Sequence, residues 1–139
     1  MGSEASVYTY ANGEADYAVN FAQLTQRAGN FLVGREPEPD FQWENLKGKK
    51  VLGGRAGGMP QMVFEYILKK NGIDPKTDLS IDQSINFGLT AAAFTSNDAD
   101  YTVEFEPFAT ALEQEGNGHV AASLGESSGY VPYTAYCAK

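Results

Sequence analysis

The glycine-rich stretch from Gly53 to Gln61 constrains this chain more than any other segment. It reads Gly-Gly-Arg-Ala-Gly-Gly-Met-Pro-Gln and lies between an apolar strand pattern over 50–52 and a helical pattern over 60–70. Its glycines let the backbone turn sharply, and Pro60 suits the first turn of a helix. We therefore predict a strand–turn–helix corner, whose free N–H groups and helix dipole suit an anion or a polar ligand group.

The corner does not match the nucleotide-binding motifs. A Walker loop ends in Gly-Lys-Ser/Thr, whereas Gly58 is followed here by Met59 and Pro60. A dinucleotide fingerprint needs a third-position glycine, and the third residue of this stretch is Arg55. Two interpretations remain, a ligand-binding corner and an ordinary glycine-rich turn that binds nothing.

Composition excludes several classes of function. With 139 residues, 42% of them hydrophobic, the chain can form one domain with a core. The net charge of -8, from 10 Lys and Arg against 18 Asp and Glu, argues against a nucleic-acid partner and against anionic membranes. No apolar run approaches the roughly 20 residues of a membrane span.

The chain has a single cysteine and a single histidine, which excludes an internal disulfide, a cysteine cluster and a multi-histidine metal site. We expect no metal and no cofactor. Cys137 lies in an apolar strand pattern and is predicted to pack rather than react. His119, which starts a strand after a Gly-Asn-Gly turn, is predicted at the surface or at a strand edge, although it remains the one candidate imidazole base.

Strand and helix patterns alternate from Val51 to Leu124. This order predicts an α/β fold of three layers, with a mostly parallel sheet and helices on both faces. Ligands in such sheets bind at the carboxyl ends of the strands, where the corner, the stretch after Gln83 and the run Glu104–Pro107 should meet. Outside these elements we expect a helix over 4–10, a connector over 36–40, a helix over 86–94, a loop over 125–129 and an extended segment over 130–136. We also expect a long extended stretch over 16–33, which the interruption at 28–30 makes either two strands or one bent strand.

Several runs together resemble one family. They are Asn20–Arg27, Phe31–Glu36, Leu46–Lys49, Gly53–Arg55, Gly57–Pro60, Glu104–Pro107 and Val131–Tyr136. In combination they resemble the solute-binding proteins of ABC importers in the thiamine-precursor, alkanesulfonate and nitrate group. Members of that family hold a small polar ligand between two α/β lobes joined by hinge strands, outside the cytoplasm, and deliver it to an ABC permease.

The resemblance implies that this chain is the second lobe of a periplasmic-binding-protein-like fold. Residues 1–15 then hold the last helix of the first lobe, preceded by Met1-Gly2-Ser3, which we interpret from the sequence itself as a tag remnant. Residues 16–35 form the hinge or crossover strand, and 36–139 form the ligand-binding lobe and the return hinge strand. We expect the signal segment of the parent to lie outside this chain. The run 95–100 lacks the glycines that are usual in the family, so that loop should differ in shape.

The resemblance also implies the ligand contacts. They are Arg55, Gly57, Gly58, Met59, Gln61, Glu104 and Glu106, with Asn20 and Phe21 where the hinge passes the cleft. Glu104 and Glu106 could accept hydrogen bonds from ligand N–H groups, or could act only as local strand-end and helix-start carboxylates. Arg55 could pair with a ligand anion or with either glutamate.

Three hypotheses of function follow. The first is a binding lobe without catalysis, which alone should bind weakly or not at all. The second is a self-associating module that forms a homodimer through exposed hinge strands. The third is a carboxylate-based hydrolase using Glu104 and Glu106, which would share one face of a strand. No other catalytic motif accompanies that pair, so we predict that the chain is not an enzyme.

Overall fold

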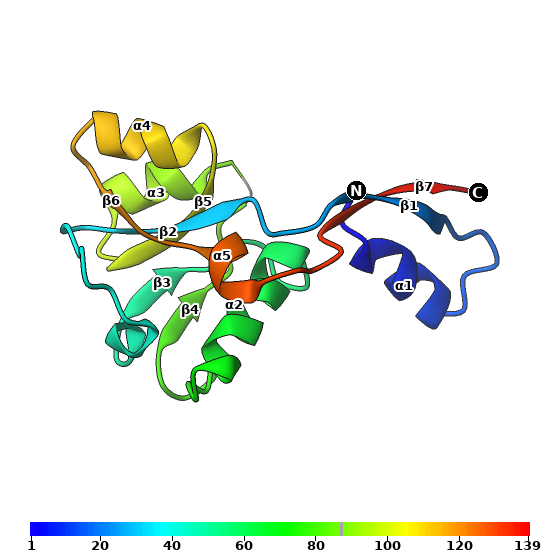
Figure 1. The fold of residues 1–139 in the computed structure, drawn as a ribbon, viewed down its shortest axis with the longest axis horizontal. Coiled ribbons are helices and arrows are strands. Elements are labelled where there is room, and N and C mark those ends of the chain that lie inside the picture. The colour runs from blue at the N-terminus through cyan, green and yellow to red at the C-terminus, as the bar shows by residue number, and fades with distance from the viewer. Residues whose placement is uncertain (87) are drawn as a thin grey trace.

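A computed structural model of the chain describes residues 1–86 and 88–139, and Figure 1 shows two parts. The first part, here called the lobe, is a five-stranded sheet with helices α2 to α5. The second, here called the ribbon, is the strand pair β1 and β7, beside which α1 lies. The elements are α1 (Glu4–Ala11), β1 (Val19–Thr25), β2 (Asn30–Gly34), the 3-10 turn η1 (Trp43–Leu46), β3 (Lys50–Leu52), α2 (Met59–Lys70), β4 (Ser80–Asp82), α3 (Thr90–Ser96), β5 (Tyr101–Phe105), α4 (Phe108–Gln114), β6 (His119–Ser123), α5 (Leu124–Ser128) and β7 (Thr134–Ala138).

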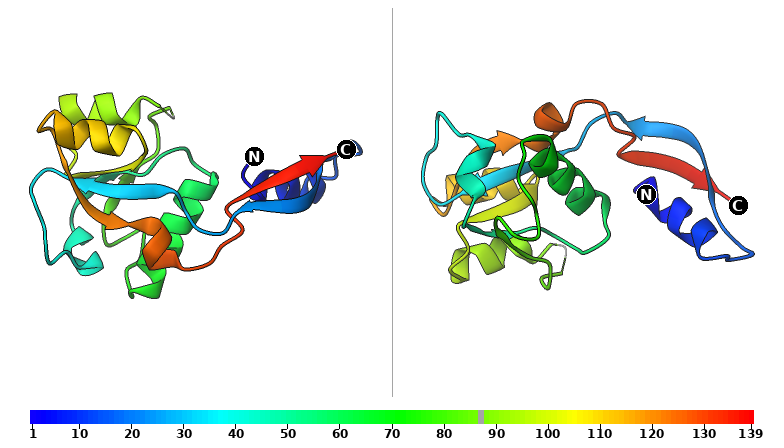
Figure 2. Two further views of the ribbon diagram at one scale, coloured as in Figure 1. Left: turned by 45° about the horizontal axis from the view of Figure 1, so that its top comes forward. Right: turned by 90° about the horizontal axis from the view of Figure 1, so that it is seen from below.

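The lobe has the predicted α/β architecture. Its strand order is β4-β3-β5-β2-β6. Strands β4, β3 and β5 are parallel, whereas β2 is antiparallel to both β5 and β6, so β2 alone runs against the other four. Helices α2 and α5 cover one face and α3 and α4 the other, as the views in Figures 1 and 2 agree. The prediction of three layers around a mostly parallel sheet is confirmed.

The core consists of one apolar cluster on each face of the sheet. Successive strand residues point to opposite faces, so Leu32 packs in the cluster under α2 and α5, and Val33 packs in the cluster under α3 and α4. Both side chains are fully buried, as are Phe64 of α2 and Phe94 of α3. The helices therefore close both faces of the sheet against water.

Several element boundaries differ from the predictions. The extended stretch 16–33 is two strands, β1 and β2, and not one bent strand, and α2 begins at Met59. The helix expected over 86–94 begins at Thr90; Phe87 lies outside the described residues. The predicted loop over 125–129 is wrong, because this segment lies largely in the short helix α5. The Ser123 hydroxyl caps that helix by accepting a hydrogen bond from the Glu126 N–H at 3.2 Å.

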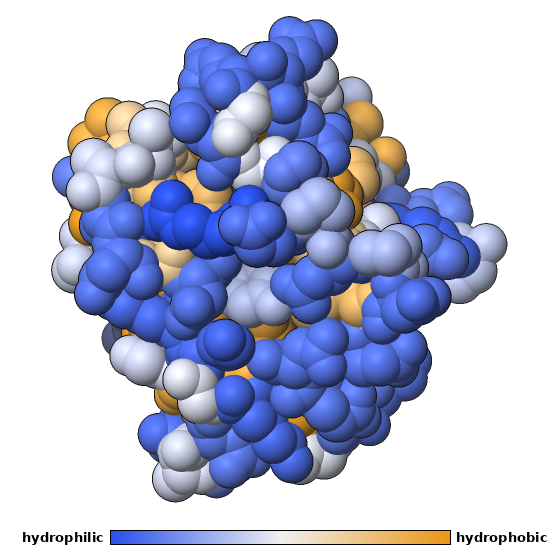
Figure 3. Space-filling view, turned by 90° about the vertical axis from the view of Figure 1, so that its left-hand side faces the viewer, coloured by the Kyte–Doolittle hydropathy of each residue, from blue (hydrophilic) through white to orange (hydrophobic). Residues whose placement is uncertain are grey.

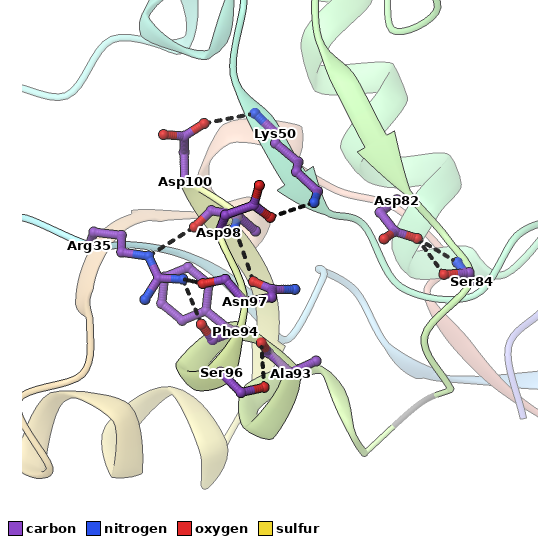
Figure 4. A network of polar contacts seen from close by, with 11 residues as sticks. Arg35, Lys50, Asp82, Ser84, Ala93, Phe94, Ser96, Asn97, Asp98 and Asp100 are labelled. Carbon is purple, nitrogen blue, oxygen red and sulfur yellow. Dashed lines mark hydrogen bonds and ion pairs between the residues drawn. The ribbon is translucent and has the colours of Figure 1, made fainter.

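The loop over 95–100 is held by Arg35 (Figure 4). The Arg35 guanidinium donates hydrogen bonds to the carbonyls of Phe94 at 2.6 Å, Asn97 at 2.7 Å and Ala99 at 2.9 Å. It also lies over the Phe94 ring, 4.1 Å from its centre. One charged side chain thus satisfies the carbonyls where α3 ends and fixes the path of the loop that follows.

The ribbon differs from the lobe in burial. β1 pairs antiparallel with β7, and all of its residues except Asn20 are exposed. Cys137 lies on β7 and is partly buried, whereas His119 begins β6, the edge strand of the lobe sheet, as predicted. The end of the lobe opposite the ribbon is mostly hydrophilic (Figure 3). Within the described residues, no helix combines the length and the apolar character that a membrane crossing needs.

Candidate functional site

The glycine corner has the predicted strand–turn–helix geometry. β3 ends at Leu52, and α2 begins at Met59. Gly54 and Gly57 have φ angles of +78° and +75°, where any other residue would be strained. The Gln61 side-chain carbonyl accepts a hydrogen bond from the Gly57 N–H and so closes the turn from inside the helix. The corner therefore places the start of α2 at the carboxyl end of β3.

A cavity of about 350 Å³ opens at this edge of the sheet. Three segments form most of its wall: the corner, the segment before α3, and the end of β5 with the start of α4. These are the three segments that were predicted to meet there. The ribbon end of the molecule supplies a fourth side. The lining residues are Gly2, Glu4, Gly54, Arg55, Gly58, Met59, Pro60, Gly88, Thr90, Val103, Glu104, Phe105, Phe108, Tyr133 and Thr134.

Glu104 is the buried carboxyl of this cavity. The residue is only 3% exposed, and the Thr102 hydroxyl donates a hydrogen bond to it at 2.6 Å. Burial raises the pKa of Glu104 above its ordinary value, and hydrogen bonds from Thr102 and Thr90 partly oppose that shift. An N–H donor from a ligand would stabilise the ionised form, so this group suits a hydrogen-bonding role in the cavity.

Glu4 and Tyr133 are cavity residues that the sequence reasoning missed. A Glu4 carboxylate oxygen accepts a hydrogen bond from the Met59 N–H, at the start of α2, at 3.1 Å. The other Glu4 oxygen and the Tyr133 hydroxyl are buried and have no hydrogen-bond partner among the described residues. Burial, aided by the charge of Glu4, raises the pKa of Tyr133. Tyr133 lies in one of the family-like runs, but no local signal in the sequence connects Glu4 to the corner.

Asn20 and Phe21 lie on β1 and line a second cavity of about 560 Å³ between α1, β1 and α2. Glu4 and Met59 line both cavities and so form the wall that they share. The Asn20 amide donates to the Ser3 carbonyl at 3.0 Å, which ties β1 to the start of α1.

The remaining predicted contacts have other positions. Gly57, Gln61 and Glu106 line neither cavity. Gln61 bonds within the corner, while the exposed Glu106 accepts from the Thr110 N–H at 3.1 Å and so caps α4. Arg55 lines the first cavity and is exposed, and no salt bridge of Arg55 with either glutamate forms among the described residues.

No described group of three or more His, Cys, Asp or Glu side chains is arranged to hold a metal ion. The polar side chains that line the first cavity carry two carboxyls, a phenol, two threonine hydroxyls and one guanidinium. Such a set can bind a small polar molecule, and the aromatic side chains of Phe105 and Phe108 supply an apolar wall.

The fold is that of one part of an ABC solute-binding protein. The alkanesulfonate-binding protein SsuA from Xanthomonas axonopodis pv. citri matches 94% of this chain and 43% of its own with a TM-score of 0.71 at 18% identity. The aliphatic sulphonate binding protein SsuA from Escherichia coli matches 86% of this chain and 40% of its own, with a TM-score of 0.70 at 19% identity. The ligand-binding component of an ABC-type import system from Staphylococcus aureus gives a TM-score of 0.63 at 17% identity, over 96% of this chain and 44% of its own.

One curated relative is much closer in sequence. The Bacillus subtilis (strain 168) protein named "Putative binding protein YtlA" is 52% identical over all 139 residues. The chain spans 42% of that relative's length. Within this chain, Gly2 forms an isolated antiparallel bridge with Thr134 of β7. No protein-family model matches the chain.

Proposed function

We propose that this chain is a single ligand-binding lobe of an ABC solute-binding protein, which captures a small polar molecule between two lobes for import. The cavity at the carboxyl ends of β3 and β5 carries this proposal, because it brings the start of α2 and the buried Glu104 to one place. The parent would act outside the cytoplasm with an ABC permease as its partner. Residues 16–35 and β7 would then be the hinge segments, and 36–139 the lobe with its return strand.

Within this proposal the predicted contacts divide into two groups. Arg55, Gly58, Met59 and Glu104 line the cavity and are the candidate ligand contacts. Asn20 and Phe21 line the second cavity and not the first. They would therefore contact the ligand only where it extends past Glu4 and Met59, the two residues that line both cavities. The rest, Gly57, Gln61 and Glu106, act as supports of the corner and of α4.

Binding without catalysis is favoured over a carboxylate-based hydrolase. That reaction needs two carboxyl groups on either side of the bond that is cleaved. Glu104 lies in the cavity, but Glu106 lies beyond the end of β5 and outside the cavity lining. The relative's name, a binding protein, supports the same choice.

The test compares this chain with full-length YtlA. Both are titrated with a panel of aminopyrimidines, alkanesulfonates and nitrate, by calorimetry and native mass spectrometry. Two-lobed receptors close around their ligand, so a single lobe loses half of the contacts and the closure. We expect the chain to bind the ligand of YtlA on the order of 100-fold more weakly, about 2.7 kcal/mol. Equal affinity, or turnover of any panel compound, would contradict the proposal.

Self-association is the second candidate, and the exposed ribbon favours it. Val19 and Phe21 of β1 and Tyr136 of β7 are 55%, 68% and 53% exposed, on a strand pair with free edges. Sedimentation at increasing concentration tests this idea. A dimer that Phe21→Ser weakens, while Val120→Ser on the edge of the lobe sheet does not, would support it; a monomer throughout would count against it.

A further inference from the structure

The start of α2 is already occupied by a carboxylate of the chain itself. α2 has 12 residues, and its first N–H groups carry the positive end of the helix dipole. The Glu4 carboxylate lies there, with one oxygen 3.1 Å from the Met59 nitrogen. A ligand anion that sought the same N–H group would have to displace Glu4.

Two buried polar atoms beside this contact lack a partner among the described residues. They are the second carboxylate oxygen of Glu4 and the hydroxyl of Tyr133, a residue only 5% exposed. Both residues line the cavity, together with the buried carboxyl of Glu104. Buried polar groups in folded proteins are nearly always hydrogen-bonded, so these atoms indicate where a ligand would bind. A carboxylate oxygen needs a donor, and a phenol can serve as donor or acceptor.

The charge around these atoms disfavours an anion. Of the described residues that line the cavity, Arg55 alone is basic, and its side chain is exposed. An anion placed between Glu4 and Glu104 would be repelled by the Glu4 carboxylate, and by Glu104 whenever that group is ionised, in a site of reduced dielectric constant. A cationic or N–H-bearing group at the same position would instead form charge-assisted hydrogen bonds.

We propose that Glu4 is the residue that sets ligand charge: by occupying the start of α2 it makes the cavity select a ligand with a positively charged or N–H donor group. The chemical class is a small cation or N–H donor with a flat apolar face, which would pack on the wall formed by Phe105 and Phe108. The structural neighbours described as sulfonate-binding proteins have anionic ligands, so Glu4 predicts a different ligand charge here. This inference rests on the proposed binding function.

The test uses two probes of similar shape and opposite charge, benzamidinium and benzenesulfonate. Each is titrated into the full 139-residue chain, with chemical shifts of the Met59 and Thr90 amides as the readout, for wild type, Glu4→Gln and Glu4→Ala. We expect wild type to bind benzamidinium at least about 10-fold more tightly than benzenesulfonate. Glu4→Gln should remove that preference, since the amide oxygen can still accept from the Met59 N–H but carries no charge. Glu4→Ala frees the helix start and should gain benzenesulfonate binding.

Two further variants separate a charge role from a structural one. Glu44→Gln makes the same chemical change at an exposed position of η1, outside both cavities, and should leave both affinities unchanged. Tyr133→Phe removes the unpartnered hydroxyl and should weaken benzamidinium without any gain of benzenesulfonate. Melting curves of every variant establish that each is folded before it is titrated.

The inference is overturned if wild type prefers benzenesulfonate, if it binds benzamidinium no better than benzenesulfonate, or if Glu4→Gln shifts both affinities as little as Glu44→Gln does. These outcomes concern ligand charge only. The lobe assignment is judged separately by the comparison with YtlA, so a sulfonate ligand bound tightly by YtlA and weakly by this chain would defeat the inference and leave the proposed function standing.

Discussion

The lobe and the ribbon are built from similar apolar strand sequences but bury them to very different extents. Leu32 and Val33 of β2 are fully buried, whereas Val19 and Phe21 of β1, in the preceding strand, are 55% and 68% exposed. The lobe strands have helices on both faces, while the ribbon pair has only α1 beside it. Hydrophobic patterning alone therefore does not decide which strand enters a core; the number of elements available to cover it does.

This difference in burial also means that the ribbon and the lobe should differ in stability. A two-stranded ribbon is marginal by itself, because it forms few contacts that bury apolar area. The lobe has a core on each face of its sheet and should unfold as one cooperative unit. If the ribbon segments are the hinge, as proposed, weak local packing in that place is what hinge motion requires.

Removal of a core ring from the lobe should have the largest effect. Phe64 on α2 is fully buried, so Phe64→Ala should lower the free energy of unfolding by about 3–5 kcal/mol, through lost burial and the cavity that remains. Urea denaturation followed by circular dichroism measures this. Tyr66→Ala on the same helix is the matched control; Tyr66 is 50% exposed, and its loss should cost less than about 1 kcal/mol. Similar costs for the two variants would show that the lobe core is not the main source of stability.

Much of the lobe could be predicted from the sequence, because its signals are local. The glycine corner, α2 and β5 follow from glycine and proline placement and from apolar periodicity within a few residues. The short helix α5 was missed, since five residues give no helical period and its cap is a single serine hydroxyl. The place of β2 between β5 and β6 also has no local signal, because pairing between distant strands is decided by the whole sheet.

The site could be predicted only in part for the same reason. Arg55, Gly58, Met59 and Glu104 come from elements whose order indicates the ligand-binding edge of the sheet. Glu4 reaches that edge only because the ribbon folds back and brings α1 beside α2, a contact across 55 residues of sequence. No composition or spacing rule reports such a contact.

The lobe, unlike the ribbon strands β1 and β7, buries the ionisable side chain of Glu104. The raised pKa of Glu104 means that the folded state prefers the neutral carboxyl. The contribution of this group to the free energy of unfolding is therefore greatest below the ordinary glutamate pKa. It falls as pH rises from that value through the raised pKa, by at most about 1.4 kcal/mol per pH unit. Glu104→Gln cannot ionise, so the variant should gain stability relative to wild type as pH rises from 4 to 8, measured as the difference in melting temperature.

A second substitution sharpens that test. Thr102→Val keeps the shape of the fully buried Thr102 but removes the hydroxyl that donates to Glu104 at 2.6 Å. The ionised carboxylate then loses a stabilising hydrogen bond and the pKa of Glu104 rises further, so the stability of this variant should fall over a wider pH range, and by a larger total, than that of wild type. If wild type and Glu104→Gln show the same pH dependence, burial of this carboxyl has no energetic consequence, and the lobe and ribbon do not differ in this respect.

The smallest effect is expected in the ribbon. Phe21 contacts Tyr136 across the strand pair with ring centres 6.3 Å apart, but its side chain faces largely into water. Phe21→Ser should therefore change the global free energy of unfolding by no more than about 0.5 kcal/mol. Hydrogen exchange should show instead that β1 amides open more readily in the variant while β5 amides keep their protection. A loss comparable to that of Phe64→Ala would mean that ribbon and lobe unfold as one unit, and a ribbon so coupled could not serve as a hinge that moves while the lobe stays rigid.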